Sequence, residues 1–303
     1  MRASEVMVQE LIGKARVLIE ALPYISDFRG RTVVVKVGGA AQEDPVLRRR
    51  FCEDVILLDW VGINVVVVHG GGKQITQMLD RLGMGASARF VEGQRVTDAV
   101  TLEVVEMVLG SLNQELVRLI NHLGGCAVGL TGCDGGLARA TRQVAPDLGL
   151  VGEIASIDRT VIDRLTPEFI PIVAPLAVGP EGGPLNVNAD VFAARVAQAL
   201  GAEKLVLLTD IAGVLDAERR LIPTLTARAA RLLIDDGVIS GGMIPKVQNA
   251  IAALAAGVNK VHIIDGRLEH ALLLEIFTRD GVGSQVVADD AVVSLSNGDG
   301  PPR

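Results

Sequence analysis

Hydrophobic and polar positions follow two different periods along the chain, and their alternation predicts an α/β protein. Short apolar runs bounded by turn residues indicate buried strands, whereas apolar residues three and four positions apart indicate amphipathic helices. Because the two patterns alternate, we expect an open, mostly parallel sheet sandwiched between helices. The strands are predicted at residues 32–37, 64–69, 126–130, 169–174, 204–209 and 260–264, and the helices at 46–61, 73–82, 99–123, 190–200, 226–236 and 246–256.

One more helical pattern precedes the first strand. Apolar residues from Met7 to Leu22 recur at helical spacing and predict an N-terminal extension helix over residues 4–22. Pro23, followed by Arg29 and Gly30, is expected to end it. Its apolar stripe has to be buried, either on the body of the same chain or on the same helix of another subunit.

The ends and the middle of the chain suggest a division into segments. The turn-rich sequence GPEGGP, residues 179–184, is the best internal boundary. The C-terminal residues lack an apolar pattern and are expected to be disordered. The expected segments are an N-terminal helix at 1–29, two lobes at 30–180 and 181–287, and a disordered tail at 288–303.

Composition narrows the class of protein. The 303 residues are 49% hydrophobic but only 3% aromatic, so aliphatic side chains have to fill a core typical of sheets covered on both faces. The net charge of −7 disfavours nucleic acid as the main partner, while local lysines leave an anionic small molecule open. No stretch resembles a signal peptide or is long enough to span a bilayer, so a cytoplasmic protein without a membrane partner is expected. The three cysteines lack metal-ligand spacing and are expected to be isolated thiols.

Two glycine-rich motifs follow buried strands and indicate anion binding. In the first, Lys36 stands near the end of an apolar strand before Gly38 and Gly39; a buried lysine is costly unless an anion meets it, although it can also be purely structural. In the second, three glycines at 70–72 lead into a helix N-terminus, where free N–H groups and the helix dipole favour an anion. This motif is neither a P-loop nor a dinucleotide fingerprint, which disfavours hydride transfer. His69, at the end of that strand, is a conceivable base, but a histidine there is more commonly structural.

Two further motifs place polar residues next to predicted strands and helices. Asn186, Asn188 and Asp190 alternate with apolar residues, so an extended chain would aim all three to one side. Asn188 or Asp190 could equally be a helix N-cap. Lys246 falls in the first turn of a predicted helix, where the dipole disfavours a cation unless an anion is bound nearby. Asp210 ends another strand, at the edge where open α/β sheets bind ligands.

As a set, these segments resemble the amino-acid-kinase superfamily, and most closely its acetylglutamate kinases. The resemblance covers about residues 12–287 and rests on KVGGAA, VVVVHGGG, NVNAD, LLTDIAGVL and GGMIPKV. It implies the carbamate-kinase-like fold and the ATP-dependent phosphorylation of the γ-carboxylate of N-acetyl-L-glutamate, a step of arginine biosynthesis. Mg²⁺ would arrive with ATP and have no protein ligands of its own. A carboxylate with a reference pKa near ~4.3 is already ionised at neutral pH, so the reaction needs no general base.

The resemblance also implies a role for each motif residue. Lys36 and Lys246 would grip the transferring phosphoryl group, and Asp190 would hold both lysines. Arg95 and Asn186 would fix the α-carboxylate and the acetamido group of the acceptor in the lobe 30–180, while the lobe 181–287 would hold the nucleotide. The other implied residues are Gly71, Gly72 and Asn188 for the acceptor side, and Gly38, Gly39, Asp210, Gly213 and Gly242 for the nucleotide and its phosphates.

Both ends of the chain resemble the arginine-sensitive members of the family. In those enzymes the N-terminal helix links homodimers into a hexamer, so a hexamer inhibited by L-arginine is implied, and a PII signalling protein is a possible further partner. The C-terminal sequence HALLLEIFTRDGVGSQV resembles their arginine-site signature. Glu275 could otherwise be an ordinary exposed helix residue. The implied arginine-site residues are Tyr24, Lys204, His270, Glu275 and Gly283.

Three positions depart from the family pattern. Lys73 stands where proline is usual, and Gln114 and Cys133 stand where lysine is usual. An added cation beside the acceptor site and a lost one in a nearby hairpin bear on substrate preference and turnover. Two alternatives therefore remain open. One is a sibling kinase acting on aspartate, carbamate or another acylated amino acid, and the other is a weakly catalytic arginine-sensing homologue.

Overall fold

The structure is a computed structural model that describes residues 3–91, 93–166, 168–278 and 281–289. The tail expected to be disordered, 288–303, lies outside these residues except for its first two positions. All three cysteines are free thiols. No helix within the described ranges is long and apolar enough to cross a membrane.

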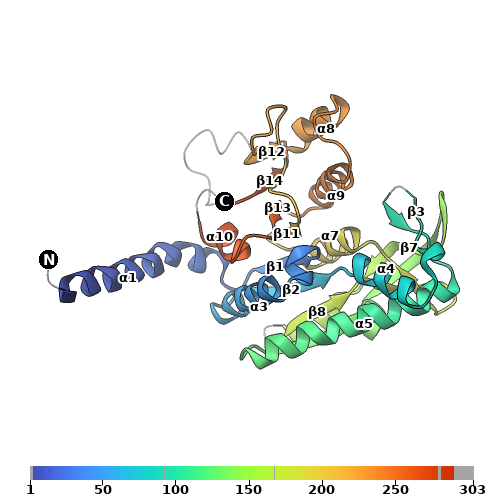
Figure 1. Cartoon of the computed structure of the whole chain (residues 1–303), viewed down its shortest axis with the longest axis horizontal. Helices are drawn as coiled ribbons and strands as arrows, with labels where there is room; N and C mark the ends of the chain where they lie inside the picture. Colours follow the sequence, from blue (N-terminus) through green and yellow to red (C-terminus); the bar gives the residue numbers. More distant parts are fainter. Residues whose placement is uncertain (1–2, 92, 167, 279–280, 290–303) are drawn as a thin grey trace.

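A central sheet, with eight strands among the described residues, carries the fold (Figure 1). Its order is β12-β14-β13-β11-β1-β2-β8-β5, and every neighbouring pair is parallel except β13 and β14. The mostly parallel sheet predicted from the sequence is confirmed, and each predicted strand lies within one residue of its predicted bounds. The strands are β1 (Thr32–Val37), β2 (Asn64–His69), β5 (Ala127–Thr131), β8 (Ile170–Ala174), β11 (Lys204–Thr209), β12 (Thr224–Thr226), β13 (Lys260–Asp265) and β14 (Ser284–Val287).

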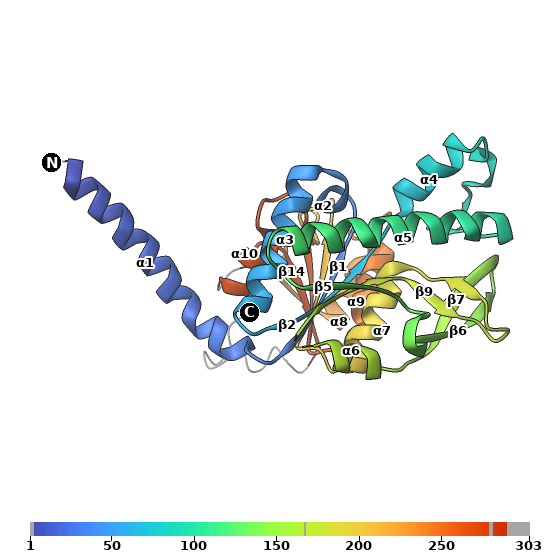
Figure 2. The same cartoon turned by 90° about the horizontal axis from the view of Figure 1, so that it is seen from below.

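Helices cover both faces of this sheet (Figure 2). Side chains at alternate strand positions face opposite sides, so Val34 of β1 packs into one apolar cluster while Val33 and Val35 pack into another. The first cluster is closed by α6 (Thr160–Leu165), α7 (Ala189–Leu200), α8 (Ala227–Asp235) and α9 (Met243–Ala255). The second is closed by α3 (Pro45–Trp60), α5 (Ala99–His122) and α10 (Ala271–Phe277).

The strand order brings the ends of three strands together. β1 lies between β11 and β2, and Lys36 of β1 is level with Leu207 of β11 and Val68 of β2. The segments that follow these strands therefore meet at one edge of the sheet. Two helices start there, α2 (Ala40–Glu43) after β1 and α4 (Gly72–Arg81) after β2.

Four further strands close into a small barrel next to the sheet, and they were not predicted. They are β6 (Ala138–Val144), β7 (Asp147–Ile157), β9 (Leu176–Val178) and β10 (Pro184–Asn186). Their short or charge-interrupted sequences contain no continuous apolar run, so periodicity does not mark them. The GPEGGP turn joins β9 to β10. The hairpin of β3 (Phe90–Val91) and β4 (Gln94–Arg95) and the short 3₁₀ turns η1 (Gly85–Ser87) and η2 (Asp134–Gly136) were also not predicted.

The N-terminal helix α1 (Ala3–Phe28) is longer than predicted and projects away from the body (Figures 1 and 2). The predicted end at Leu22 is wrong, because the helix continues through Pro23. A proline inside a helix removes the hydrogen bond to the carbonyl four residues earlier, here that of Ile19, whose residue is exposed to water. Between Leu11 and Leu22 the large apolar side chains described there are exposed to water, with Leu18 71% exposed. Near the end, Phe28 is buried against the body.

Candidate active site

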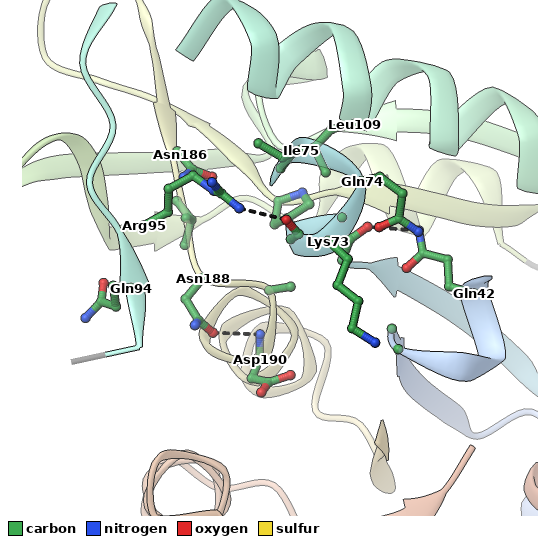
Figure 3. Close-up of a pocket in the computed structure, with 18 of the residues that line it drawn as sticks. Gln42, Lys73, Gln74, Ile75, Gln94, Arg95, Leu109, Asn186, Asn188 and Asp190 are labelled. Carbon is green, nitrogen blue, oxygen red and sulfur yellow. Dashed lines mark hydrogen bonds between the residues drawn. The ribbon is translucent and has the colours of Figure 1, made fainter. Parts of the chain in front are cut away.

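A cleft of about 340 Å³ opens at the edge of the sheet where β1 and β2 end (Figure 3). Figure 3 shows Arg95 and Asn186 on one side, Gln42 and Lys73 on the other, and Asp190 between them. The fold thus gathers residues that are up to about half the chain apart in sequence. Of the sequence-predicted site residues, those lining the cleft are Lys36, Gly38, Gly39, Gly71, Gly72, Arg95, Asn186, Asn188, Asp190 and Asp210.

Asp190 lies between two lysines at the floor of the cleft. Its Oδ1 is 2.9 Å from Nζ of Lys36 on β1, and its Oδ2 is 3.1 Å from Nζ of Lys246 on α9. Burial alone would raise the pKa of Asp190, but the two ammonium groups outweigh burial and lower this pKa to about 2. The three groups together carry one net positive charge at neutral pH. Such a site attracts an anion while holding both lysines in fixed positions.

Asn188 is the helix cap that the sequence left unassigned. Its side-chain Oδ1 accepts hydrogen bonds from the backbone N–H groups of Asp190, at 2.9 Å, and Val191, at 3.2 Å. The cap starts α7 and directs Asp190 toward the lysines from the first turn. Asn186 lies two residues earlier and donates from Nδ2 to Oγ1 of Thr97 at 3.1 Å.

The glycines at the strand ends are required by close approach. Gly39 has a left-handed backbone with φ of 60°, and a Cβ there would collide with the carboxylate of Asp210. That carboxylate accepts a hydrogen bond from the backbone N–H of Ala40 at 2.6 Å. At Gly71 a Cβ would clash with two leucines of α5. The backbone of these turns is therefore held close to the floor of the cleft.

His69 supports the second glycine turn. It is fully buried, and burial lowers its pKa to about 4, so the ring is neutral. Nδ1 of His69 lies 3.0 Å from the carbonyl oxygen of Gly70. Because a carbonyl oxygen can only accept, Nδ1 carries the proton and donates it. Nε2 of the ring lies 3.2 Å from Nδ2 of Asn113. Gln42 also donates to the Gly70 carbonyl, at 2.9 Å. This geometry fits the structural reading of His69.

Arg95 offers an unused donor to the cleft. Its Nη2 donates to the carbonyl of Gly72 at 2.7 Å and to Oγ1 of Thr76 at 2.8 Å. The guanidinium lies over the ring of Phe90, 4.6 Å from its centre. Its Nη1 is buried without a hydrogen-bond partner among the described residues. A buried guanidinium with a free N–H group is suited to a carboxylate.

A second cavity, of about 970 Å³, adjoins the first one. Lys246 lines it, and the Asp190 carboxylate that pairs with Lys246 lines the cleft. Gly213 and Gly242, which the family resemblance assigns to the nucleotide, also line the second cavity. The lysine–aspartate–lysine group therefore stands where the two cavities meet.

A resident metal ion finds no ligand set in the part of the chain that the structure covers. No group of three or more His, Cys, Asp and Glu residues lies close enough there to hold one. Both oxygens of Asp190 are already paired with lysines.

The residues predicted for an arginine site are only partly brought together. Glu275 is buried rather than exposed, and its Oε2 accepts from the N–H groups of Val282 at 2.8 Å and Gly283 at 3.1 Å. Its other oxygen accepts from Nδ1 of His262 at 2.5 Å. Burial lowers the pKa of His262 to about 4. Burial would raise the pKa of Glu275, but the hydrogen bond and charge of His262, together with the Val282 N–H group and the Lys204 charge, outweigh burial and lower that pKa.

His262 was missed by sequence reasoning, which selected His270 instead. His270 pairs with Asp54 of α3, with Nδ1 and Oδ1 2.5 Å apart, and burial raises the pKa of Asp54 to about 6. Lys204 starts β11, next to the strand of His262, and its ammonium lies 4.7 Å from the ring centre of Phe28. Tyr24 is half-buried against the apolar cluster on the side of the sheet covered by α3, α5 and α10. A buried histidine in an otherwise aliphatic strand was the signal available in the sequence.

Only one of the three departures from the family pattern reaches the cleft. Lys73 lines it, whereas Gln114 and Cys133 do not. Cys133 is half-buried beside η2, where its N–H donates to Oγ1 of Thr131 at 3.2 Å.

Sequence comparison gives a consistent result. The sequence model of the amino acid kinase family matches residues 31–265. The acetylglutamate kinase of Chromobacterium violaceum is 51% identical over 291 residues, which are 93% of this chain and 100% of that protein. The acetylglutamate kinase of Paracidovorax citrulli is 52% identical over 284 residues, which are 90% of this chain and 95% of that protein.

Structural comparison agrees on the fold. N-acetylglutamate synthase from Neisseria gonorrhoeae, complexed with coenzyme A and N-acetyl-glutamate, superimposes with a TM-score of 0.82 at 28% identity. That match covers 91% of this chain but only 63% of the synthase. Carbamate kinase from Giardia lamblia, bound to AMP-PNP, matches with a TM-score of 0.61 at 17% identity, over 86% of this chain and 99% of that one, which speaks to the fold alone. On the strength of the family match and the relatives at half identity, the chain belongs to the acetylglutamate kinases of the amino acid kinase family.

Proposed function

We propose that the protein transfers the γ-phosphoryl group of ATP to the γ-carboxylate of N-acetyl-L-glutamate, forming N-acetyl-L-glutamyl 5-phosphate. One observation carries the proposal: Asp190 holds Lys36 and Lys246 at the junction of two cavities. One cavity is lined by Arg95 and suits a small acid, and the larger one suits a nucleotide. The relatives at half identity are named for this activity.

The chemistry needs position and positive charge rather than a base. The acceptor carboxylate is ionised at neutral pH and attacks as it stands. The barrier comes from the approach of two anions and from charge on the phosphoryl group in transfer. Lys36, Lys246 and the backbone N–H groups of the glycine turns would offset that charge. Mg²⁺, bound to the phosphates of ATP, would supply further positive charge.

The division of labour follows the two cavities. The acceptor would lie between Arg95, Asn186, Asn188 and the turn of Gly71 and Gly72, with its α-carboxylate on the free Nη1 of Arg95. The nucleotide would lie against Asp210, Gly213 and Gly242, with its phosphates reaching the turn of Gly38 and Gly39. On this proposal residues 30–180 form most of the acceptor lobe and residues 181–287 most of the nucleotide lobe, while Asn186 and Asn188 reach the acceptor from the second lobe and Gly38 and Gly39 reach the phosphates from the first.

Two alternative functions are less well supported. Carbamate has no α-carboxylate for Arg95 to meet, which disfavours a carbamate kinase. A catalytically silent sensor would have no need for the two lysines that flank Asp190, and both are present.

The direct test is ADP release with three acceptors. Purified protein with ATP and Mg²⁺ is expected to release ADP with N-acetyl-L-glutamate and to release little with glutamate or aspartate, because only the acylated acid satisfies both ends of the acceptor cavity. A coupled enzymatic assay measures this directly. Equal rates with all three acids would contradict the proposed substrate, and no release with any of them would favour the sensor.

We further propose that L-arginine inhibits the enzyme and that α1 joins dimers into a hexamer. The buried Glu275 with its neighbours His262, Lys204 and Gly283 supplies carboxylate and backbone groups for a guanidinium ligand, and Nε2 of His262 is buried without a partner among the described residues. N-acetylglutamate synthase from Neisseria gonorrhoeae, complexed with coenzyme A and L-arginine, has a TM-score of 0.80 to this chain. The exposed stripe of α1 fits the same helix of a second copy.

Deleting residues 1–22 is expected to give dimers with weakened arginine inhibition and intact turnover. The deletion removes the open stripe but spares Phe28, which packs on the body and lies under the Lys204 ammonium. Analytical ultracentrifugation and inhibition curves measure the two effects. A dimer at full length, or activity indifferent to millimolar arginine, would leave α1 without this role.

A further inference from the structure

Among the described residues that line the cleft, Lys73 is the one cation outside the lysine–aspartate–lysine group and Arg95. It occupies the first turn of α4, directly after the three glycines. Its Nζ is 3.1 Å from Oε2 of Glu43, at the end of α2, and 3.7 Å from Oδ2 of Asp210. Glu43 first, and Asp210 after it, raise the pKa of Lys73, so its ammonium is charged at neutral pH.

This position is unfavourable for a lysine unless anions are near. The N-terminus of a helix carries partial positive charge and unpaired N–H groups, which repel a cation. Glu43 and Asp210 supply the compensating charge in the ligand-free site. Beyond these two ion pairs little restrains the Lys73 side chain, because it is 61% exposed to water. The ammonium is thus free to exchange one anionic partner for another.

The location of the ammonium is where a phosphate chain has to pass. Asp210 lines the cleft, while Thr209 before it and Ile211 after it line the second cavity. Lys73, paired to Asp210, is therefore at the border of the two cavities. Figure 3 shows the Lys73 side chain extending along the cleft on the side opposite to Arg95, the residue proposed to bind the α-carboxylate of the acceptor.

Charge balance at this border favours a role with phosphate. Lys73, Glu43 and Asp210 together carry one net negative charge, which would repel a nucleotide. If Lys73 leaves Glu43 for a phosphate oxygen, it gains a dianionic partner and a charge-assisted hydrogen bond. The helix N-terminus of α4 then has an anion beside it, as such termini favour.

We propose that Lys73 is a third phosphate-binding lysine of this enzyme, which Glu43 holds in the ligand-free site and which contacts the phosphate chain of ATP in the bound site. The inference rests on the proposed kinase function and assigns Lys73 to the nucleotide rather than to the acceptor. The competing interpretation is that Lys73 only neutralises Glu43 and Asp210.

A double-mutant cycle on equilibrium binding separates the two interpretations. Titration calorimetry of ATP and ADP, without acceptor and at two salt concentrations, is run on Lys73→Met, Glu43→Gln and the double variant. Lys73→Met is expected to bind ATP about 10-fold more weakly, as for one charge-assisted contact of about 1.4 kcal/mol, with a weaker salt dependence. Glu43→Gln is expected to bind ATP roughly two- to fivefold more tightly, since the exposed ion pair no longer competes. The double variant is expected to stay as weak as Lys73→Met.

The controls and the contrary outcomes are distinct. Arg159→Met removes an exposed cation that lines neither cavity and that hydrogen-bonds Asp163 and the Ala199 carbonyl, and it is expected to leave ATP binding unchanged. Wild-type affinity in the double variant would mean that Lys73 only neutralises carboxylates, and this overturns the inference. Weaker binding of N-acetyl-L-glutamate with unchanged ATP binding would overturn it too. Failure of the wild-type protein to bind ATP at all would instead refute the proposed function.

Discussion

Lys36→Ala and Lys246→Ala are each expected to lower kcat roughly a thousandfold, about 4 kcal/mol of transition-state stabilisation, while the protein still folds. Nζ of Lys36 lies 2.9 Å and Nζ of Lys246 3.1 Å from the Asp190 carboxylate. On the proposed mechanism both ammonium groups would offset the charge that develops on the phosphoryl group. Folding should survive because Asp190 keeps one ammonium partner in either variant. Steady-state kinetics measure the loss, and circular dichroism with thermal unfolding verifies the fold.

Asp190→Asn is the informative companion variant. It leaves two ammonium groups next to an amide, so they repel each other and leave their positions, and the loss in kcat should match or exceed that of either lysine. Residues that act as one unit give non-additive losses. The double variant of both lysines should therefore be little worse than the more damaged single variant. If Lys36→Ala and Lys246→Ala each kept more than about a tenth of the activity, a loss below ~1.4 kcal/mol, the assignment would be wrong.

Arg95→Lys is expected to raise the KM for N-acetyl-L-glutamate by roughly 10- to 100-fold and to change the KM for ATP little. Arg95 uses Nη2 for the Gly72 carbonyl and Thr76, which leaves Nη1 for the acceptor. A lysine side chain has a single nitrogen, so it cannot hydrogen-bond the glycine turn and the acceptor carboxylate at once, as the planar guanidinium can. It also loses the stacking on Phe90.

A matched control comes from the same hairpin region. Arg89 precedes β3, is exposed and lies outside the cleft lining, so Arg89→Lys should leave both Michaelis constants unchanged. Equal effects of Arg95→Lys on the two substrates, or none, would move Arg95 to a structural role in holding the glycine turn. Initial-rate kinetics with each substrate varied in turn distinguish these results.

Much of the sheet followed from local sequence alone. β1, β2 and β11 match their predicted bounds, because a buried parallel strand is a continuous aliphatic run, which needs no information from distant residues. A glycine or a lysine at the end of a strand can likewise be recognised from the local sequence alone. Lys36 could be singled out for that reason, Lys246 because a lysine is unusual in the first turn of a helix, and Asp190 because it alternates with apolar residues after Asn186 and Asn188.

Other elements were hidden from local patterns. β7 contains charged residues and pairs with β6 and β10, so its stability comes from neighbours and not from an apolar run. The helix α1 passes Pro23 because one missing hydrogen bond in a water-exposed helix costs less than the remaining turns contribute. A sequence rule that ends helices at proline does not compare these two contributions to helix stability, so it placed the end of α1 too early.

The sequence by itself determined the class of sheet and the residue types at its active edge, since both depend on periodicity and on single residues at strand ends. Only the tertiary structure decided which of these residues meet. The strand order β11-β1-β2 brings Asp210 next to Gly39 and within reach of Lys73. The packing of α10 against β13 places His262, and not His270, against Glu275. These contacts join residues on different strands and helices, and their geometry depends on how those elements pack, which no local pattern encodes.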